Sequence, residues 1–319
     1  MINLIGKRNY FFALSILILL AGAVGYIIQG VVLDIQFEGG TVIQIQMPDD
    51  NYDIATAETI VRDTIGKTAI VQKASTYSAE SGASKTYLMN LKIGSAETLS
   101  QEDRSKVIEA LKKGYNLKED TETTVNSIEP FIGAELMRNG LLAVFWSSLL
   151  IIIYVWLRFK VMSGLPAGVV AVLALIHDIL IMLTVYILFR IPLNDSFIAA
   201  VLTVIGYSMN DTIIIYDRIR ENSRLLKKIS IAQLVNTSVV QTLNRSINTT
   251  ITVLICIITV FVFASVNNIQ SIKEFTFPLI IGLSSGVYST IFIASSLYVM
   301  WMEHKAKRKV ATRAARSKA

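Results

Sequence analysis

Apolar residues occur in six runs of about 20 residues, and polar segments separate these runs. An α-helix rises 1.5 Å per residue, so a run of about 20 residues crosses the roughly 30 Å hydrocarbon core of a bilayer. The pattern predicts six transmembrane helices, at Tyr10–Val32, Gly140–Leu157, Pro166–Phe189, Ser196–Tyr216, Ile247–Ser265 and Phe277–Met302. The first run lacks a small-residue cleavage site, so we interpret it as a retained anchor.

The polar segment 34–137, between the first two runs, has the pattern of a small mixed α/β domain. Apolar residues recur at every second position in Tyr87, Met89, Leu91 and Ile93, which is typical of a half-buried strand. Ser100 and Asp103 approximate a capping box before an expected helix. The predicted elements are strands at 35–47, 69–75, 86–93 and 121–128 and helices at 53–65 and 101–113. This βαββαβ order is the ferredoxin-like arrangement.

The same patterns predict how the chain is divided. Gly39 and Gly40 interrupt the first expected strand, which favours a bulge or bend over a contact site for a substrate chain. Apolar residues among basic and amide ones predict an interfacial helix near 217–244. The expected parts are the N-terminus with the first helix (1–33), the ferredoxin-like domain (34–137), a five-helix transmembrane bundle with the interfacial helix (138–303) and a basic tail (304–319).

Basic residues indicate the orientation of the helices. With the N-terminus in the cytoplasm, the two short outer loops contain only Arg190 and Lys273, whereas the inner segments contain most of the membrane part's basic residues. Cytoplasmic loops are enriched in Lys and Arg, so both termini are expected in the cytoplasm and 34–137 on the exoplasmic side. The chain is 53% hydrophobic with a formal net charge of +6. We assign that charge to the inner face, where basic residues can contact membrane lipid. We expect no nucleic-acid partner.

Several kinds of site are not expected. Cys256 is the single cysteine and lies in the fifth run, so no intrachain disulfide stabilises the polar segment. The two histidines, His177 and His304, are far apart, and the sequence contains no metal-spaced Cys/His cluster and no P-loop. We therefore predict a protein that is not an enzyme, with no cofactor and no metal, whose energy source is not a nucleotide bound by this chain.

Asp211 is a candidate functional residue because it lies inside the fourth apolar run, six residues before Asp217. On a helix this spacing places it about 9 Å inside the membrane boundary. A charged group in a span costs at least about 2.5 kcal/mol and marks an ion pathway, a substrate site or an obligatory pair. Arg245 begins the next run from the same side. Making and breaking an Asp211–Arg245 pair would load and release a proton, and a fixed pair that only sets helix register is the alternative.

Other polar residues extend this candidate site. Thr203, Tyr207 and Asp211 recur at i, i+4 and i+8, so they form a stripe that either lines a water-filled path or joins helices. Asp178, in the third run, either belongs to a proton relay or accepts a hydrogen bond from a neighbouring hydroxyl, while His177 is expected to pack as a neutral side chain.

Small residues in the last run predict close helix contacts. Gly282 and Gly286 have the G-x-x-x-G spacing, which lets helix backbones approach one another.

Five stretches resemble the SecF family of bacterial protein-export subunits. The most specific extends from Gly206 to Asn222 and contains Asn210 and Asp211. The others are 34–40, which contains Phe37, Gly39 and Gly40, and then 154–159, 175–178 and 241–246. Together with the six runs, these stretches cover nearly the whole chain.

This resemblance implies half of an assembly similar to resistance-nodulation-division transporters, completed by SecD as a heterodimer. It implies use of the proton or sodium motive force to draw an unfolded secretory polypeptide from the SecYEG channel, in company with YajC and YidC, in the bacterial inner membrane. The ion-coupling residues of the family correspond to Asp211 and Arg245, with Asn210 and Asp178 as further candidates. Met209 and Asn244 stand where Leu and Ser are common, which leaves the ionisable groups unchanged.

Two other functions fit parts of the pattern. A half of a small-molecule exporter shares the same architecture, but one exposed domain of about 100 residues is small for paired porter domains. An intramembrane aspartyl protease needs two aspartates within reach, which Asp178 and Asp211 superficially offer. The Gly-x-Gly-Asp arrangement is absent, and Arg245 would disturb a shared-proton dyad.

Overall fold

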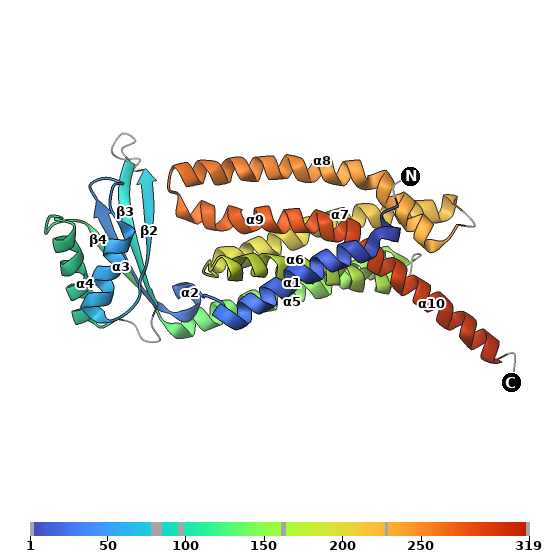
Figure 1. The fold of residues 1–319 in the computed structure, drawn as a ribbon, viewed down its shortest axis with the longest axis horizontal. Coiled ribbons are helices and arrows are strands. Elements are labelled where there is room, and N and C mark those ends of the chain that lie inside the picture. Colours follow the sequence, from blue (N-terminus) through green and yellow to red (C-terminus); the bar gives the residue numbers. More distant parts are fainter. Residues whose placement is uncertain (1–2, 78–84, 95–98, 161–163, 227–228, 317–319) are drawn as a thin grey trace.

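The protein is elongated, with a bundle of long helices and a small α/β domain at one end (Figure 1). The structure, a computed structural model, describes residues 3–77, 85–94, 99–160, 164–226 and 229–316. The end of the expected basic tail, 317–319, lies outside these residues. Both ends of the chain lie at the end of the bundle opposite the α/β domain (Figure 1).

Six helical segments of the described chain are long and apolar enough to cross a membrane, as the six apolar runs predict. The last of them is a continuous path in which a π-helical segment joins two α-helices. In chain order they are α1 (Arg8–Gln29, after the 3-10 turn η1, Ile5–Lys7), α5 (Pro130–Arg158), α6 (Gly164–Leu188), α7 (Asp195–Leu225), α8 (Ile231–Val266) and the α9 (Gln270–Tyr288), η4 (Ser289–Ala294) and α10 (Ser295–Arg316) path.

Residues 217–244 do not form a separate interfacial helix, so that prediction was wrong. Residues 217–225 continue α7, and residues 231–244 are the first turns of α8. Ser230 starts α8 because its side chain accepts from the Gln233 N–H while the Gln233 side chain accepts from the Ser230 N–H. The polar ends of both helices therefore extend the transmembrane helices themselves.

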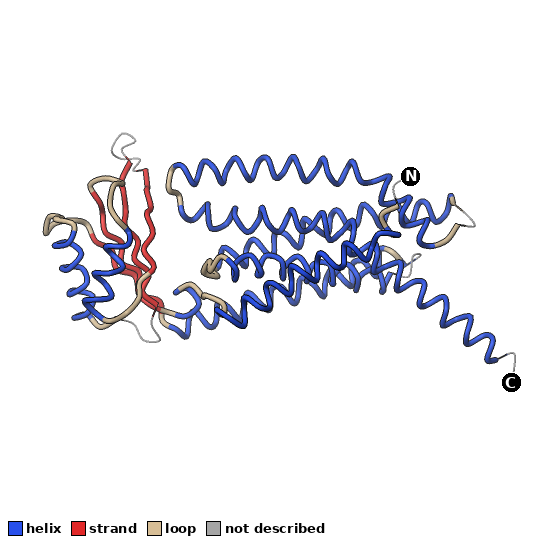
Figure 2. Tube along the Cα trace, viewed as in Figure 1, coloured by secondary structure: helices blue, strands red, loops and turns tan. Residues whose placement is uncertain are grey.

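The α/β domain has the predicted order of elements: β1 (Gly40–Met47), α3 (Ile54–Ile65), β2 (Ile70–Tyr77), β3 (Lys85–Gly94), α4 (Gln101–Gly114) and β4 (Thr123–Ile128). The strands form one antiparallel sheet in the order β2-β3-β1-β4. Ile43 pairs with Leu91 on one side and Val125 on the other. Helices α3 and α4 cover the sheet face that turns away from the bundle (Figure 2), where Val61 and Leu111 are fully buried.

The first strand begins later than predicted. Residues Ile35–Glu38 form a short helix, α2, because Asp34 caps it by accepting from the Gln36 N–H. Gly39 ends α2 with a φ of 83°, and a Cβ on Gly40 would clash with the carbonyl oxygen of Ile93. The glycine pair is thus a helix-to-strand turn, which agrees with the expected bend and not with a bulge inside a strand.

Polar and apolar contacts near α2 join the domain to the bundle. The Lys92 ammonium of β3 lies 2.7 Å from the Asp34 carboxylate and 3.7 Å from Glu274 of α9. Asn194, at the start of α7, donates a hydrogen bond of 2.6 Å to Glu274. Phe37 of α2 is buried in the same apolar cluster as residues of α6 and α7. The domain is therefore anchored to three helices of the bundle.

A second contact lies at the β2 edge of the sheet. The Ser75 N–H donates to the carbonyl of Asn268 at 3.3 Å, and its hydroxyl donates to the carbonyl of Asn267. The Asn268 side chain donates to Asp50 at 3.0 Å. Both asparagines belong to the turn between α8 and α9, so this turn contacts the domain directly.

Candidate functional site

Asp211 lies where α7 contacts α8. Asn194 caps α7 by accepting a hydrogen bond from the Phe197 N–H at 3.1 Å. Asp211 is buried, with 1% of its surface exposed, and its side chain lies near Thr250 and Arg245 of α8. Its Oδ1 atom has no hydrogen-bond partner among the described residues. Leaving a buried polar atom unpaired costs about 1–3 kcal/mol, so this position favours a bound proton, cation or donor.

Like the Asp211 oxygen, two hydroxyls of α8 are buried and have no hydrogen-bond partner among the described residues. Ser246 and Thr250 are one turn apart on α8, and the buried hydroxyl oxygen of each lacks a hydrogen-bond partner in the described part of the chain. Tyr207, one turn before Asp211, donates to the carbonyl of Thr249 at 3.2 Å. We call Asp211, Ser246 and Thr250 the α7–α8 oxygen cluster. Oxygen ligands suit hard cations, and a carboxylate also accepts a proton.

Arg245 lies near this cluster but does not form an ion pair with Asp211. Its side chain is exposed on α8, although its charge acts on Asp211. Among the described residues, Asp211 forms no ion pair within 4 Å. The pair predicted from the sequence is therefore open in this conformation.

Asp178 occupies a different environment on α6. It is fully buried and accepts hydrogen bonds from Ser208 of α7 at 3.1 Å, Ser285 of α9 at 2.6 Å and Ser289 of η4 at 2.8 Å. Of the two alternatives for Asp178, the hydroxyl partner on a neighbouring helix is present, and there are three such partners. These bonds tie α6 to α7, α9 and η4.

His177 extends this network to α1, which differs from the expectation that it only packs. Its Nδ1 lies 3.3 Å from the Asp178 carboxylate, and its Nε2 lies 3.0 Å from the Ser15 hydroxyl. The Ser15 hydroxyl donates to Tyr288, whose own hydroxyl donates to the carbonyl of Phe11. A chain of hydrogen bonds therefore connects α1 with α6 and α9, and Asp211 is not part of it.

Gly282 and Gly286 lie where α9 passes closest to its neighbours. A Cβ on Gly282 would lie 2.5 Å from the Val204 side chain and 2.8 Å from the Met182 sulfur. A Cβ on Gly286 would lie 3.1 Å from the Ser208 side chain. The absence of side chains at these positions brings α9 near enough for Ser285 to reach Asp178.

The remaining candidates lie on exposed surfaces. Asn210 is exposed on α7, and Asn244 and Asn248 are exposed on α8 beside Arg245. Asp217 forms ion pairs with Arg158 and Arg220, and Arg218 pairs with Glu221, as expected for a charged cluster at a helix end.

No group of three potential metal ligands occurs among the His, Cys, Asp and Glu residues that the structure describes. The two membrane aspartates also have separate surroundings, since Asp178 bonds to serines and Asp211 faces α8. This arrangement gives no support to a shared-proton aspartyl dyad.

Sequence reasoning missed Ser246 and Thr250 near Asp211, and Ser285 and Ser289 beside Asp178. The available signal was the spacing of hydroxyls within apolar runs. Ser246 and Thr250 are four residues apart, and so are Ser285 and Ser289. That spacing places each pair on one helix face.

Comparisons with known proteins agree over nearly the whole length. Residues 107–304 match the family described as "Protein export membrane protein SecD/SecF, C-terminal". The protein translocase subunit SecF of Anaerolinea thermophila is 32% identical, over 94% of this chain and 94% of its own length. The SecF of Alicyclobacillus acidocaldarius is 33% identical, over 96% of this chain and 94% of its own length.

Longer relatives contain a region similar to this chain as one part. The protein translocase subunit SecDF of Bacillus subtilis is 32% identical, over 95% of this chain but only 38% of its own length. The crystal structure of SecDF from Thermus thermophilus, described as a translocon-associated membrane protein, superimposes with a TM-score of 0.76 at 30% identity. That match covers 95% of this chain and 39% of the solved chain.

Proposed function

The chain belongs to the SecD/SecF family of protein-export membrane proteins, and we propose that, with a SecD partner, it uses the proton or sodium motive force to promote late-stage translocation of secretory proteins through SecYEG. Its relatives are named translocase subunits, which supports a transport role in the Sec pathway. Its six apolar helices are those of a multi-pass membrane protein. The finer mechanism rests on the α7–α8 oxygen cluster.

The carrying observation is the buried Asp211 carboxylate, one oxygen of which has no hydrogen-bond partner among the described residues, close to Arg245, which forms no ion pair with them. When the carboxylate is charged and empty, Arg245 is drawn towards it. When it holds a proton, that attraction disappears and α8 is released. A sodium ion bound by Asp211 with Ser246 and Thr250 would act in the same way, since its charge replaces that of the guanidinium.

Movement of α8 has a direct route to the α/β domain. The turn after α8 contacts Ser75 and Asp50 through Asn268. We propose that the ferredoxin-like domain, 34–137, lies on the exoplasmic side and contacts the exported polypeptide, and that this turn transmits the displacement of α8 to it.

The partner is proposed to lie against α7 and α8. Asn210, Asn244, Arg245 and Asn248 are exposed there, although polar side chains in spanning helices normally face protein or water. This chain corresponds to 39% of the solved SecDF chain. We propose that a SecD half, which would account for the remainder, packs against that face.

Export itself is the first test. In bacteria depleted of their own SecF, expression of this chain with its SecD is expected to restore the processing of secretory precursors, measured by pulse-chase labelling. Drug tolerance should stay unchanged, because the proposed cargo is a polypeptide. Unrestored export together with altered drug tolerance would favour the small-molecule exporter.

Topology is the second test. With Cys256→Ser as background, single cysteines at exposed domain positions such as Glu58 and Glu109 are expected to react with a membrane-impermeant maleimide in intact cells. Cysteines replacing Arg224 or Lys160, at the opposite end, should react only after lysis. The inverse labelling pattern would place both termini outside the cytoplasm and contradict the proposed orientation.

A further inference from the structure

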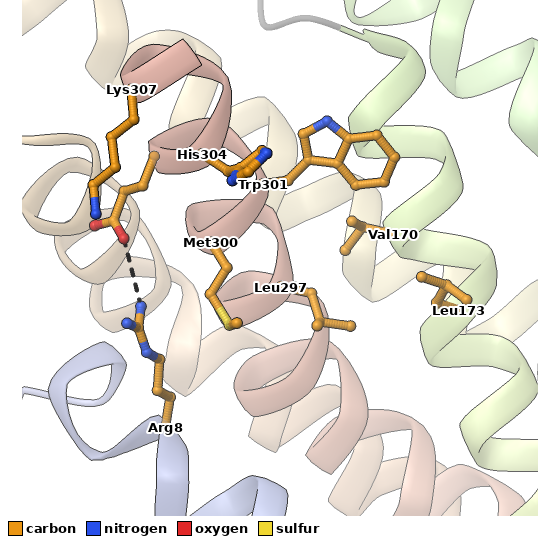
Figure 3. A pocket seen from close by; sticks show the side chains of 9 residues that line it. Arg8, Val170, Leu173, Leu297, Met300, Trp301, His304 and Lys307 are labelled. Atoms are coloured by element: carbon orange, nitrogen blue, oxygen red, sulfur yellow. Dashed lines mark ion pairs between the residues drawn. The ribbon is translucent and has the colours of Figure 1, made fainter. Parts of the chain in front are cut away.

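A groove lies at the end of the bundle away from the α/β domain, between α1, α6 and α10 (Figure 3). Its volume is about 540 Å³, which is within the range of ligand-binding clefts. Most of its wall is apolar and comes from Val170, Leu173, Leu297, Met300 and Trp301. The remaining lining residues are Arg8, Glu303, His304 and Lys307.

The charged residues gather at one end of the groove. Arg8 and Lys307 both point towards the carboxylate of Glu303, which lies between them, and Val170 and Leu173 lie at the other end (Figure 3). Arg8 is 3.8 Å from the Glu303 carboxylate, and both side chains are partly exposed, so this ion pair is weak. Lys307 forms no ion pair with the described residues. Two cations and one carboxylate leave the charged end with net positive charge.

The apolar walls are open to the surroundings of the bundle. Leu173 is 45% exposed, and Trp301 is 41% exposed. On a membrane-spanning bundle, such a wall contacts acyl chains and not water. Tryptophan favours the boundary between hydrocarbon and headgroups, which is where basic pockets between helices bind anionic lipid headgroups.

We propose that this groove binds one anionic phospholipid, whose phosphate replaces the Glu303 carboxylate as the partner of Arg8 and lies near Lys307, with an acyl chain along Val170, Leu173 and Leu297. The positive charge at one end of the groove selects an anionic headgroup, and the apolar wall accommodates the acyl chain. A bound lipid would join α1 to α6 and α10 at this end of the bundle. Deeper in the bundle, Asp178 and His177 already join α1 to α6.

Trp301 supplies the test, because it lines the groove and the chain has three tryptophans. With Trp146→Phe and Trp156→Phe, Trp301 is the single tryptophan of the full chain, and excitation at its absorption edge avoids the tyrosines. The chain is reconstituted in vesicles that contain brominated phosphatidylglycerol or brominated phosphatidylcholine at equal mole fraction. Bromine quenches tryptophan on contact, and the anionic lipid is expected to quench with about five-fold or greater relative affinity.

Arg8→Gln with Lys307→Gln should remove this preference. A matched pair, Lys160→Gln with Arg224→Gln, removes the same charge from exposed positions outside the groove and should retain it. Arg8→Lys with Lys307→Arg retains the charge and should also retain the preference, which separates loss of binding from loss of fold. Equal quenching by both lipids, or an unchanged preference in the Gln pair, overturns the proposal. Protection of Trp301 from both lipids would mean that protein covers the groove, and also overturns it.

Discussion

Asp211→Asn is expected to abolish the stimulation of export by the ion gradient while leaving insertion and SecD binding intact. Asparagine has nearly the shape of aspartate but neither titrates nor carries charge. The α7–α8 oxygen cluster would then have a single state, so α8 would receive no alternating force from Arg245. The measurement is the rate of precursor translocation into membrane vesicles with and without an imposed gradient. In both conditions, the variant should translocate precursors at the rate that the unmodified protein shows without a gradient.

Two further changes make this result specific. Asp217→Asn removes an exposed carboxylate from the same helix and should preserve gradient dependence, because its ion pairs lie at the surface. Arg245→Lys retains the charge but alters its position and its hydrogen-bonding fork, so coupling should be reduced. Undiminished gradient dependence in Asp211→Asn would make Asp211 a fixed register contact and move the search to SecD or Asp178.

Asp178→Ala is expected to destabilise the bundle by about 2 kcal/mol, because three hydroxyls on α7, α9 and η4 lose their shared acceptor. Hydrogen bonds between membrane helices contribute about 0.6 kcal/mol each, and three together give this magnitude. The measurement is unfolding of the purified chain with SecD in mixed micelles, titrated with a denaturing detergent.

Asp178→Asn is the matched variant for this second prediction. The amide retains one acceptor oxygen and the volume of aspartate, so it should lose less than half as much stability. Export should still respond to the gradient, since Asp178 has a full set of hydroxyl partners in this conformation. A loss of gradient dependence equal to that of Asp211→Asn would instead make Asp178 part of the ion path.

The sequence was sufficient for features that depend on local pattern. Runs of apolar residues gave the six helices, because crossing a bilayer requires only length and hydrophobicity. Alternation at Tyr87, Met89 and Leu91 gave β3, because side chains on a strand alternate between two faces. Asp211 stood out because a charge in an apolar run is rare. Residues 35–38 and 217–244 were predicted incorrectly, since caps at Asp34 and Ser230 set those boundaries.

Only the tertiary structure decided which polar groups meet. Asp178 and Asp211 look alike in the sequence, as single carboxylates in apolar helices. Three serines surround the first, while one oxygen of the second lacks a hydrogen-bond partner among the described residues. A helix fixes which of its residues share a face, but their partners come from helices distant in the chain. How closely those helices approach depends on packing contacts, such as Gly286 against Ser208, that no local pattern encodes.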